Sequence, residues 1–110
     1  MKGTNIGEFE ELVLLTVAAL LDEAYSVAIC DELSIQTGRT VKLGVVHAVL
    51  SRLEEKGLLD SHLGEATKMR GGKRKRFYQL TISAKEALVN TKLVRDQLWE
   101  RIPTLSWKNI

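Results

Sequence analysis

The sequence predicts a mainly α-helical fold that carries one small β-hairpin. Apolar residues recur at helical spacing through most of the 110-residue chain, whereas one short segment alternates and another is rich in aromatic and branched residues, as strands are. The only proline, Pro103, lies near the C-terminal end and leaves the predicted helices uninterrupted. A chain of this length has room for a single hydrophobic core.

Three helices are predicted in the first half of the chain. The first spans Glu8 to Leu21; acidic residues occupy its first turn, where the helix dipole favours negative charge, and its later residues are almost all apolar. The second spans about Tyr25 to Gln36 and stops before Gly38, which suits the left-handed conformation that follows many helices. The third spans about Leu43 to Lys56 and stops before Gly57 for the same reason.

A hairpin and a fourth helix complete the predicted order. The strands are Leu59–Leu63 and Phe77–Thr81, and the polar segment Gly64–Lys75 is a long loop between them. In the first strand Leu59, Ser61 and Leu63 alternate with Asp60 and His62, as the inward and outward residues of a half-buried strand do. The fourth helix spans about Ser83 to Arg101, and Pro103 limits its end. Three helices followed by a two-stranded hairpin are the arrangement of a winged helix-turn-helix, here with an added C-terminal helix. In that fold the third helix enters the major groove of DNA, and the hairpin, or wing, touches the neighbouring backbone.

Positive charge is concentrated in the second part of the chain. Residues 1–36 carry seven acids and one base, whereas residues 37–110 carry fifteen bases and seven acids. The segment from Lys68 to Arg76 alone holds six positive charges in nine residues, with Gly71 and Gly72 at its centre. Lysine and arginine neutralise phosphates, and glycines let a loop approach a duplex closely. A solvated surface loop is the alternative, but the position at a hairpin tip favours contact with DNA.

The third helix has one apolar and one small, polar side. Val46, Leu50 and Leu53 recur on the side predicted to be buried. The opposite side needs small and hydrogen-bonding residues if the helix is to lie in a major groove, although an ordinary solvent-facing side would look similar. The residues predicted there are Lys42, Val45, His47, Ala48, Ser51 and Arg52.

An apolar stripe follows the fourth helix, with residues spaced as in a helix-pairing surface. Its members are Ala87, Thr91, Val94, Leu98 and Ile102, flanked by Leu88 and Trp99. The stripe could pack on the domain's own core, but a helix of about 19 residues is ~28 Å long and exceeds what a small core covers. We therefore predict a homodimer, with residues 1–82 as the DNA-binding domain and residues 83–110 as the dimerisation helix and tail. Trp99 could instead line a ligand pocket.

Catalysis has little support in the sequence. The spacing of His47, His62 and Cys30 does not match a metal site, and no glycine motif for phosphate binding is present. We predict no enzymatic activity and no cofactor. A single cysteine, no secretory signal and no apolar run of membrane-spanning length favour the cytoplasm and no membrane association.

Several motifs together resemble the PadR family of bacterial transcriptional regulators. The resemblance covers about residues 6–101, and the motifs of the third helix and the wing are specific in combination. The matching stretches are Gly7–Glu10, Leu14-Leu15, Ala24-Tyr25, Leu43-Gly44, Leu50–Leu58, Arg70–Tyr78 and Leu80-Thr81. The single C-terminal helix resembles the short branch of the family.

The resemblance implies a DNA-binding homodimer in which the C-terminal helix packs against the partner's N-terminal helix. It also implies repression of nearby genes, relieved in many members by a small-molecule effector. Double-stranded DNA with a near-palindromic operator is the expected partner. By position, the family's DNA contacts fall on Lys42, Gly44, His47, Arg52, Arg70, Gly71, Gly72, Lys73 and Lys75.

The chain departs from the family pattern at two of these positions. Lys42 stands where serine is usual and His47 where tyrosine is usual, so the contacts made there differ in chemistry. Ser26 and Ala84 each replace a usual glycine.

Another class of function also fits a winged helix: a protein–protein module whose basic wing binds an acidic partner. Architectural or RNA binding is a third possibility.

Overall fold

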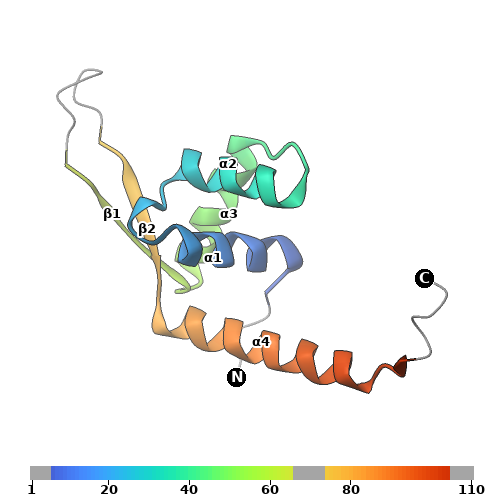
Figure 1. The fold of residues 1–110 in the computed structure, drawn as a ribbon. Helices are drawn as coiled ribbons and strands as arrows, with labels where there is room; N and C mark the ends of the chain where they lie inside the picture. The colour runs from blue at the N-terminus through green and yellow to red at the C-terminus, as the bar shows by residue number, and fades with distance from the viewer. Residues whose placement is uncertain (1–5, 66–73, 105–110) are drawn as a thin grey trace.

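The computed structural model describes residues 6–65 and 74–104. Figure 1 shows three helices packed into one cluster, a hairpin that projects from it, and a last helix that runs beside α1 and continues past it. This is the winged helix-turn-helix with an added C-terminal helix that the sequence predicts. The elements are α1 (Glu8–Leu20), a short 3-10 helix η1 (Leu21–Glu23), α2 (Ser26–Thr37), α3 (Leu43–Glu55), β1 (Leu59–Leu63), β2 (Arg76–Leu80) and α4 (Ile82–Arg101).

The helix ends lie within one residue of their predicted positions because local chain chemistry sets them. Gly38 follows α2 with a φ of 70°, and Gly57 follows α3 with a φ of 78°, the left-handed conformation that glycine adopts without steric cost. Thr81 caps α4: its hydroxyl oxygen accepts a hydrogen bond from the Ala84 amide at 3.2 Å. The chain leaves α1 at Leu21, a non-glycine residue with a φ of 55°.

The hydrophobic core lies between α1, α2, α3 and the start of the hairpin. Val46, Leu50 and Leu53 are fully buried, which confirms the predicted inner side of α3, and Val49 joins them. Cys30 is buried too, as a small apolar residue, and its Sγ lies 3.2 Å from the Val41 carbonyl oxygen. Within the described residues, no helix is both long enough and apolar enough to cross a membrane.

The hairpin is anchored on the connection between α1 and α2. Its antiparallel register pairs Leu59 with Leu80 and Ser61 with Tyr78, and the Tyr78 amide donates to the Ala24 carbonyl oxygen at 2.9 Å. The predicted alternation in β1 is wrong at its far end: Leu59 is buried, but Leu63 is 44 % exposed. The strand has left the core by that point, so no layer remains to cover Leu63.

Candidate nucleic-acid interface

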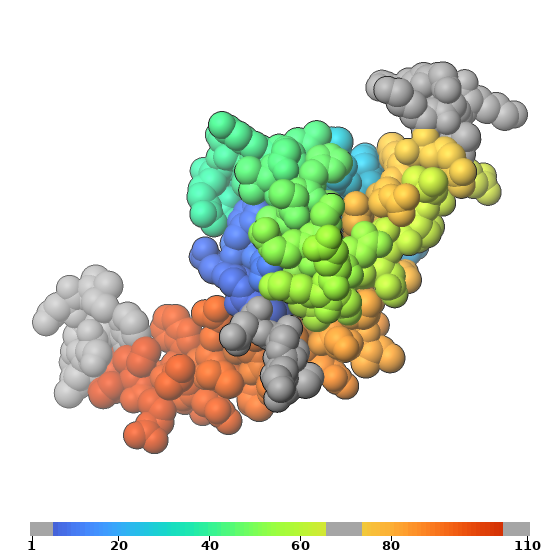
Figure 2. Space-filling view, turned by 180° about the vertical axis from the view of Figure 1, so that it is seen from behind, coloured from blue at the N-terminus to red at the C-terminus, as the bar shows by residue number. Residues whose placement is uncertain are grey.

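The predicted DNA-contacting residues of α3 lie on its exposed side. Lys42 precedes the helix as its N-cap residue, and Gly44, His47 and Ser51 follow along the exposed surface. A methyl group built at Gly44 would meet no heavy atom within 4 Å, so the backbone there is open to a ligand. Figure 2 shows the green surface of α3 on the same side of the molecule as the yellow hairpin.

Arg52 is attached to the N-terminal helix. Its Nε donates to the Glu10 carboxylate at 3.2 Å, and the Lys56 Nζ donates to the same carboxylate at 3.0 and 3.1 Å. The Gly7 amide supplies another hydrogen bond at 3.0 Å. The Arg52 side chain remains 53 % exposed, whereas the Glu10 side chain is only 11 % exposed. We call Glu10, Arg52 and Lys56 the Glu10 cluster; it fixes the outer edge of α3 to α1.

The ionisation of Glu10 reflects this environment. Burial raises the pKa of its carboxyl group, but the hydrogen bonds from Gly7, Lys56 and Arg52, with the charge of Lys56, outweigh that effect. The net result is a pKa below the ordinary value of 4.5, so the carboxylate is charged near neutral pH. In the sequence, Glu10 appears as one of the first-turn acids of a helix and as the last residue of the PadR-like stretch Gly7–Glu10. No local pattern links it to Arg52 and Lys56, which lie 42 and 46 residues away.

The base of the wing is held by aromatic contacts. The Phe77 ring meets the Tyr25 ring edge-on, with 5.7 Å between the ring centroids. It also stacks with the His62 ring, with 5.9 Å between the centroids. Lys75 lies with its Nζ 4.1 Å from the centre of the Tyr25 ring, a cation–π contact. The predicted contacts Arg70, Gly71, Gly72 and Lys73 lie outside the described residues, so Lys75 is the one predicted wing contact that the structure describes.

Hydrogen bonds join the end of α3 to the wing. Ser61 of β1 donates to the Glu54 carboxylate at 2.7 Å, and Arg76 of β2 donates to the Ser61 hydroxyl at 3.0 Å. Together with the Glu10 cluster, this network attaches α3 to α1 on one side and to the hairpin on the other. These hydrogen bonds therefore fix the position of α3 relative to the base of the hairpin.

The apolar stripe of α4 divides into a covered and an uncovered part. Ala87 is buried and Leu88, Thr91 and Ile102 are partly buried. Val94 is 51 % exposed, and Leu98 and Trp99 are each 63 % exposed. The ion pair between Arg95 and Glu11, at 2.9 Å, marks where α4 passes the start of α1. The described chain leaves the far part of the stripe open to solvent, as the predicted length of the helix implied.

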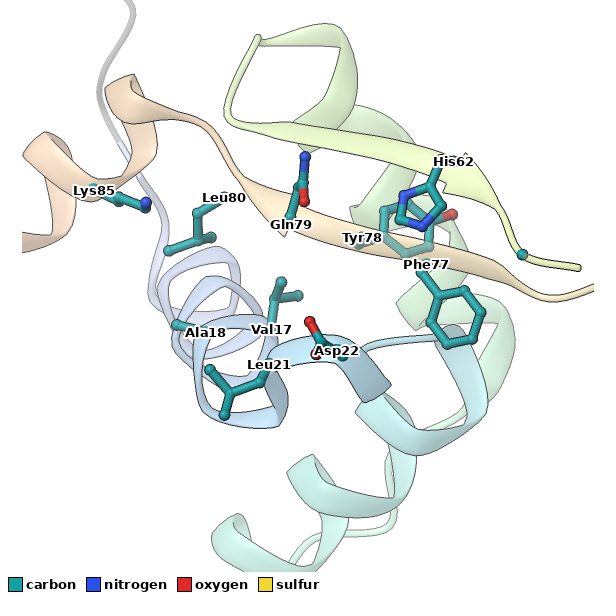
Figure 3. A pocket seen from close by; sticks show the side chains of 11 residues that line it. Val17, Ala18, Leu21, Asp22, His62, Phe77, Tyr78, Gln79, Leu80 and Lys85 are labelled. Atoms are coloured by element: carbon teal, nitrogen blue, oxygen red, sulfur yellow. The ribbon is translucent and has the colours of Figure 1, made fainter.

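A hollow that the sequence did not predict lies between α1, η1, the hairpin and the start of α4 (Figure 3). Its volume is about 660 Å³, and Trp99 is not among its lining residues. Its lining residues are Val17, Ala18, Leu21, Asp22, His62, Gly64, Phe77, Tyr78, Gln79, Leu80 and Lys85. Within the described ranges, no three histidine, cysteine or acidic residues are grouped to hold a metal ion.

Comparisons with known proteins agree on the architecture. No protein-family model matches the chain, and no curated protein sequence matches it. Among solved structures, a PadR-like transcriptional regulator from Bacillus cereus superposes with a TM-score of 0.71 at 19 % identity, covering 90 % of this chain and 91 % of that one. A PadR-like transcription factor from Bacteroides fragilis gives 0.65 at 22 % identity, covering 84 % of each chain. The chain has the fold of PadR-like regulators.

The PadR-like fold also matches part of a larger protein. The ORC1 protein of Aeropyrum pernix, solved in complex with DNA, superposes with a TM-score of 0.63 at 22 % identity. The match covers 86 % of this chain but 27 % of that one. In this PadR-like fold, α3 is the third helix of the predicted winged helix-turn-helix, and the β1–β2 hairpin is its wing.

Proposed function

We propose that the chain is a sequence-specific DNA-binding transcription regulator of the PadR type. The observation that carries the proposal is the placement of the exposed side of α3 beside a wing whose loop is strongly basic, in the fold of transcription regulators. The ORC1 protein, which shares this fold over 27 % of its chain, was solved in complex with DNA, which supports DNA as the ligand. Lys42, His47 and Ser51 would face base edges, and Gly44 would let the backbone approach. Arg52, held through its Nε, would use its exposed guanidinium on a phosphate.

The proposed active form is a homodimer built on α4. A second copy would cover the exposed Val94, Leu98 and Trp99 together with the partly buried Leu88, Thr91 and Ile102 beside them. A two-fold dimer of this fold sets its recognition helices about 34 Å apart, one turn of DNA, and binds a roughly palindromic operator. We propose residues 83–110 as the dimerisation segment and residues 1–82 as the DNA-binding domain.

Repression is the proposed outcome of binding. A dimer that covers an operator beside a promoter excludes polymerase without any further chemistry, so the proposed repression requires no cofactor and no catalytic site. A small-molecule effector that changes the distance between the two recognition helices would relieve repression. The proposed site of action is the cytoplasm, where bacterial DNA lies.

Salt dependence tests the DNA-binding proposal directly. If a dimer neutralises about six phosphates, the logarithm of affinity should fall against the logarithm of salt concentration with a slope on the order of −5. Neutralising Lys73 and Lys75 to glutamine should flatten that slope by about 0.9 for each phosphate that is no longer neutralised, and should weaken operator and random duplex equally. Fluorescence anisotropy with labelled duplexes at several salt concentrations measures both effects.

A matched variant removes the same charge elsewhere. Lys85→Gln with Lys92→Gln lowers the net charge equally but changes only α4, so the slope should stay at the wild-type value. An unchanged slope in the wing variant would remove the wing from the interface. Binding to an acidic protein with no binding to any duplex would favour the alternative function, a protein–protein module.

Operator discrimination tests the role of His47. His47 lies on the exposed side of α3. His47→Ala should therefore reduce the difference in binding free energy between the operator and random duplex by about 1–3 kcal/mol, the value of one specific base contact. The operator comes from selection of bound sequences out of a random duplex pool. Competition between this operator and a scrambled duplex gives the gap, and full discrimination in a normally folded variant would contradict the placement of α3 in the groove.

A further inference from the structure

We propose that α3 recognises the methyl groups of thymine, through Val45 and Ala48, with Leu43 at the edge of the contact. This inference rests on the proposed function and adds the base chemistry that the helix reads. It predicts that each half-site carries thymine where the first two turns of α3 face the major groove.

The first observation is the exposure of apolar side chains on the groove side of the helix. Val45 is 48 % exposed and Leu43 is 40 % exposed, and Ala48 also lies at the surface. The inner side of α3 is formed by other residues, Val46 and Val49 among them, and the exposed three do not belong to the hydrophobic core. An apolar contact is how a protein reads the C5 methyl group of thymine, which projects into the major groove.

The second observation is the set of hydrogen-bonding groups that α3 offers. Adenine is read by asparagine or glutamine, and the segment from Lys42 to Glu55 contains neither. Guanine is read by arginine or lysine, and the one arginine of the helix, Arg52, donates its Nε to Glu10. Lys42, His47 and Ser51 therefore supply the polar contacts beside the apolar side chains of Val45 and Ala48.

Charge identifies DNA as the occupant of this apolar surface. Lys42 stands at the start of α3, where the helix dipole is positive, and the β1–β2 hairpin, with the exposed bases Arg74, Lys75 and Arg76, lies on the same side of the molecule. The acids Glu54 and Glu55 stand at the other end, away from Val45 and Ala48 along the helix. This charge distribution favours contact between a polyanion and the N-terminal half of α3, and it keeps the acidic end of the helix away. An apolar protein partner would not require a basic start and an acidic end of the helix.

The test replaces thymine by deoxyuridine in the selected operator, one position at a time. This change removes only the methyl group and leaves every hydrogen-bonding group of the base pair in place. One or two positions in each half-site should show about fourfold weaker binding, the factor for one buried methyl-sized group. The wild-type protein is used throughout, so folding of a variant cannot confuse the result.

A valine variant links the effect to α3. Val45→Ala should bind the thymine operator more weakly and lose its preference for thymine over deoxyuridine at one position. Val89→Ala makes the same chemical change at an exposed valine of α4 and should keep the full preference. A half-site without thymine facing α3, or equal binding of every deoxyuridine operator, overturns the inference. Salt-sensitive binding to random duplex would then still support the proposed function, whereas absence of all duplex binding would reject both.

Discussion

The Leu98→Asp variant is expected to lose the dimer, melt at a lower temperature and fail to bind operator DNA. Leu98 is 63 % exposed in one protomer, so the new carboxylate meets solvent there at little cost. At the centre of a helix-pairing surface the same group would be buried without a partner, which costs several kcal/mol. Because an isologous interface of this kind often leaves no stable monomer, stability and DNA binding should fall together. Sedimentation velocity at micromolar concentration, thermal melting and a gel-shift assay with the operator measure the three effects.

Val89→Asp provides the matched control. Val89 also lies on α4 and is 68 % exposed, but it stands outside the apolar stripe, about half a helical turn from it. Adding the same charge there should leave the dimer, the melting temperature and operator binding close to their wild-type values. A wild-type protein that sediments as a folded monomer and binds single half-sites would contradict both the dimer and the palindromic operator.

The parts of the fold that could be predicted from the sequence are those set by local chemistry. Gly38 and Gly57 end helices because their backbones turn left-handed, and Thr81 begins one because its hydroxyl group binds a free amide. The inner side of α3 was predictable because a 3.6-residue period places Val46, Leu50 and Leu53 on one side of the helix whatever lies opposite.

The parts that the sequence did not predict depend on residues far apart in the chain. The Glu10 cluster joins the first turn of α1 to the end of α3, and the Lys75–Tyr25 contact joins the wing to the start of α2. The prediction for Leu63 was wrong because the alternation of a strand does not show where the core beneath it ends. The basic loop was the strongest signal for the candidate site, but Arg70 to Lys73 lie outside the described residues, so their contacts stay a prediction.

Glu10→Ala is expected to lower the free energy of unfolding by about 2 kcal/mol, because it removes the shared acceptor of charged hydrogen bonds from Arg52 and Lys56. For a domain of this size, that loss corresponds to roughly 10 °C in melting temperature. Glu11→Ala is the control: the side chain of this neighbouring acid is similarly buried, at 16 % exposed, but among the described residues it has an ion pair with Arg95 alone, so its loss should cost less, about 1 kcal/mol. Equal effects of the two substitutions would show that the Glu10 cluster adds nothing beyond a single ion pair.

Acid provides the sharper test of the Glu10 cluster, with Glu10→Gln as the variant. Because folding lowers the pKa of Glu10, the charged carboxylate stabilises the fold fully above the ordinary pKa of 4.5, and that contribution disappears as the pH falls through the lowered value. Wild type should therefore be more stable than Glu10→Gln near neutral pH, and the gap should close as the solution is acidified below about pH 4.5. The two proteins share every other titratable group, so the difference between their melting curves isolates Glu10. A gap that stays constant across this pH range would mean that the side chain acts by packing rather than by its charge.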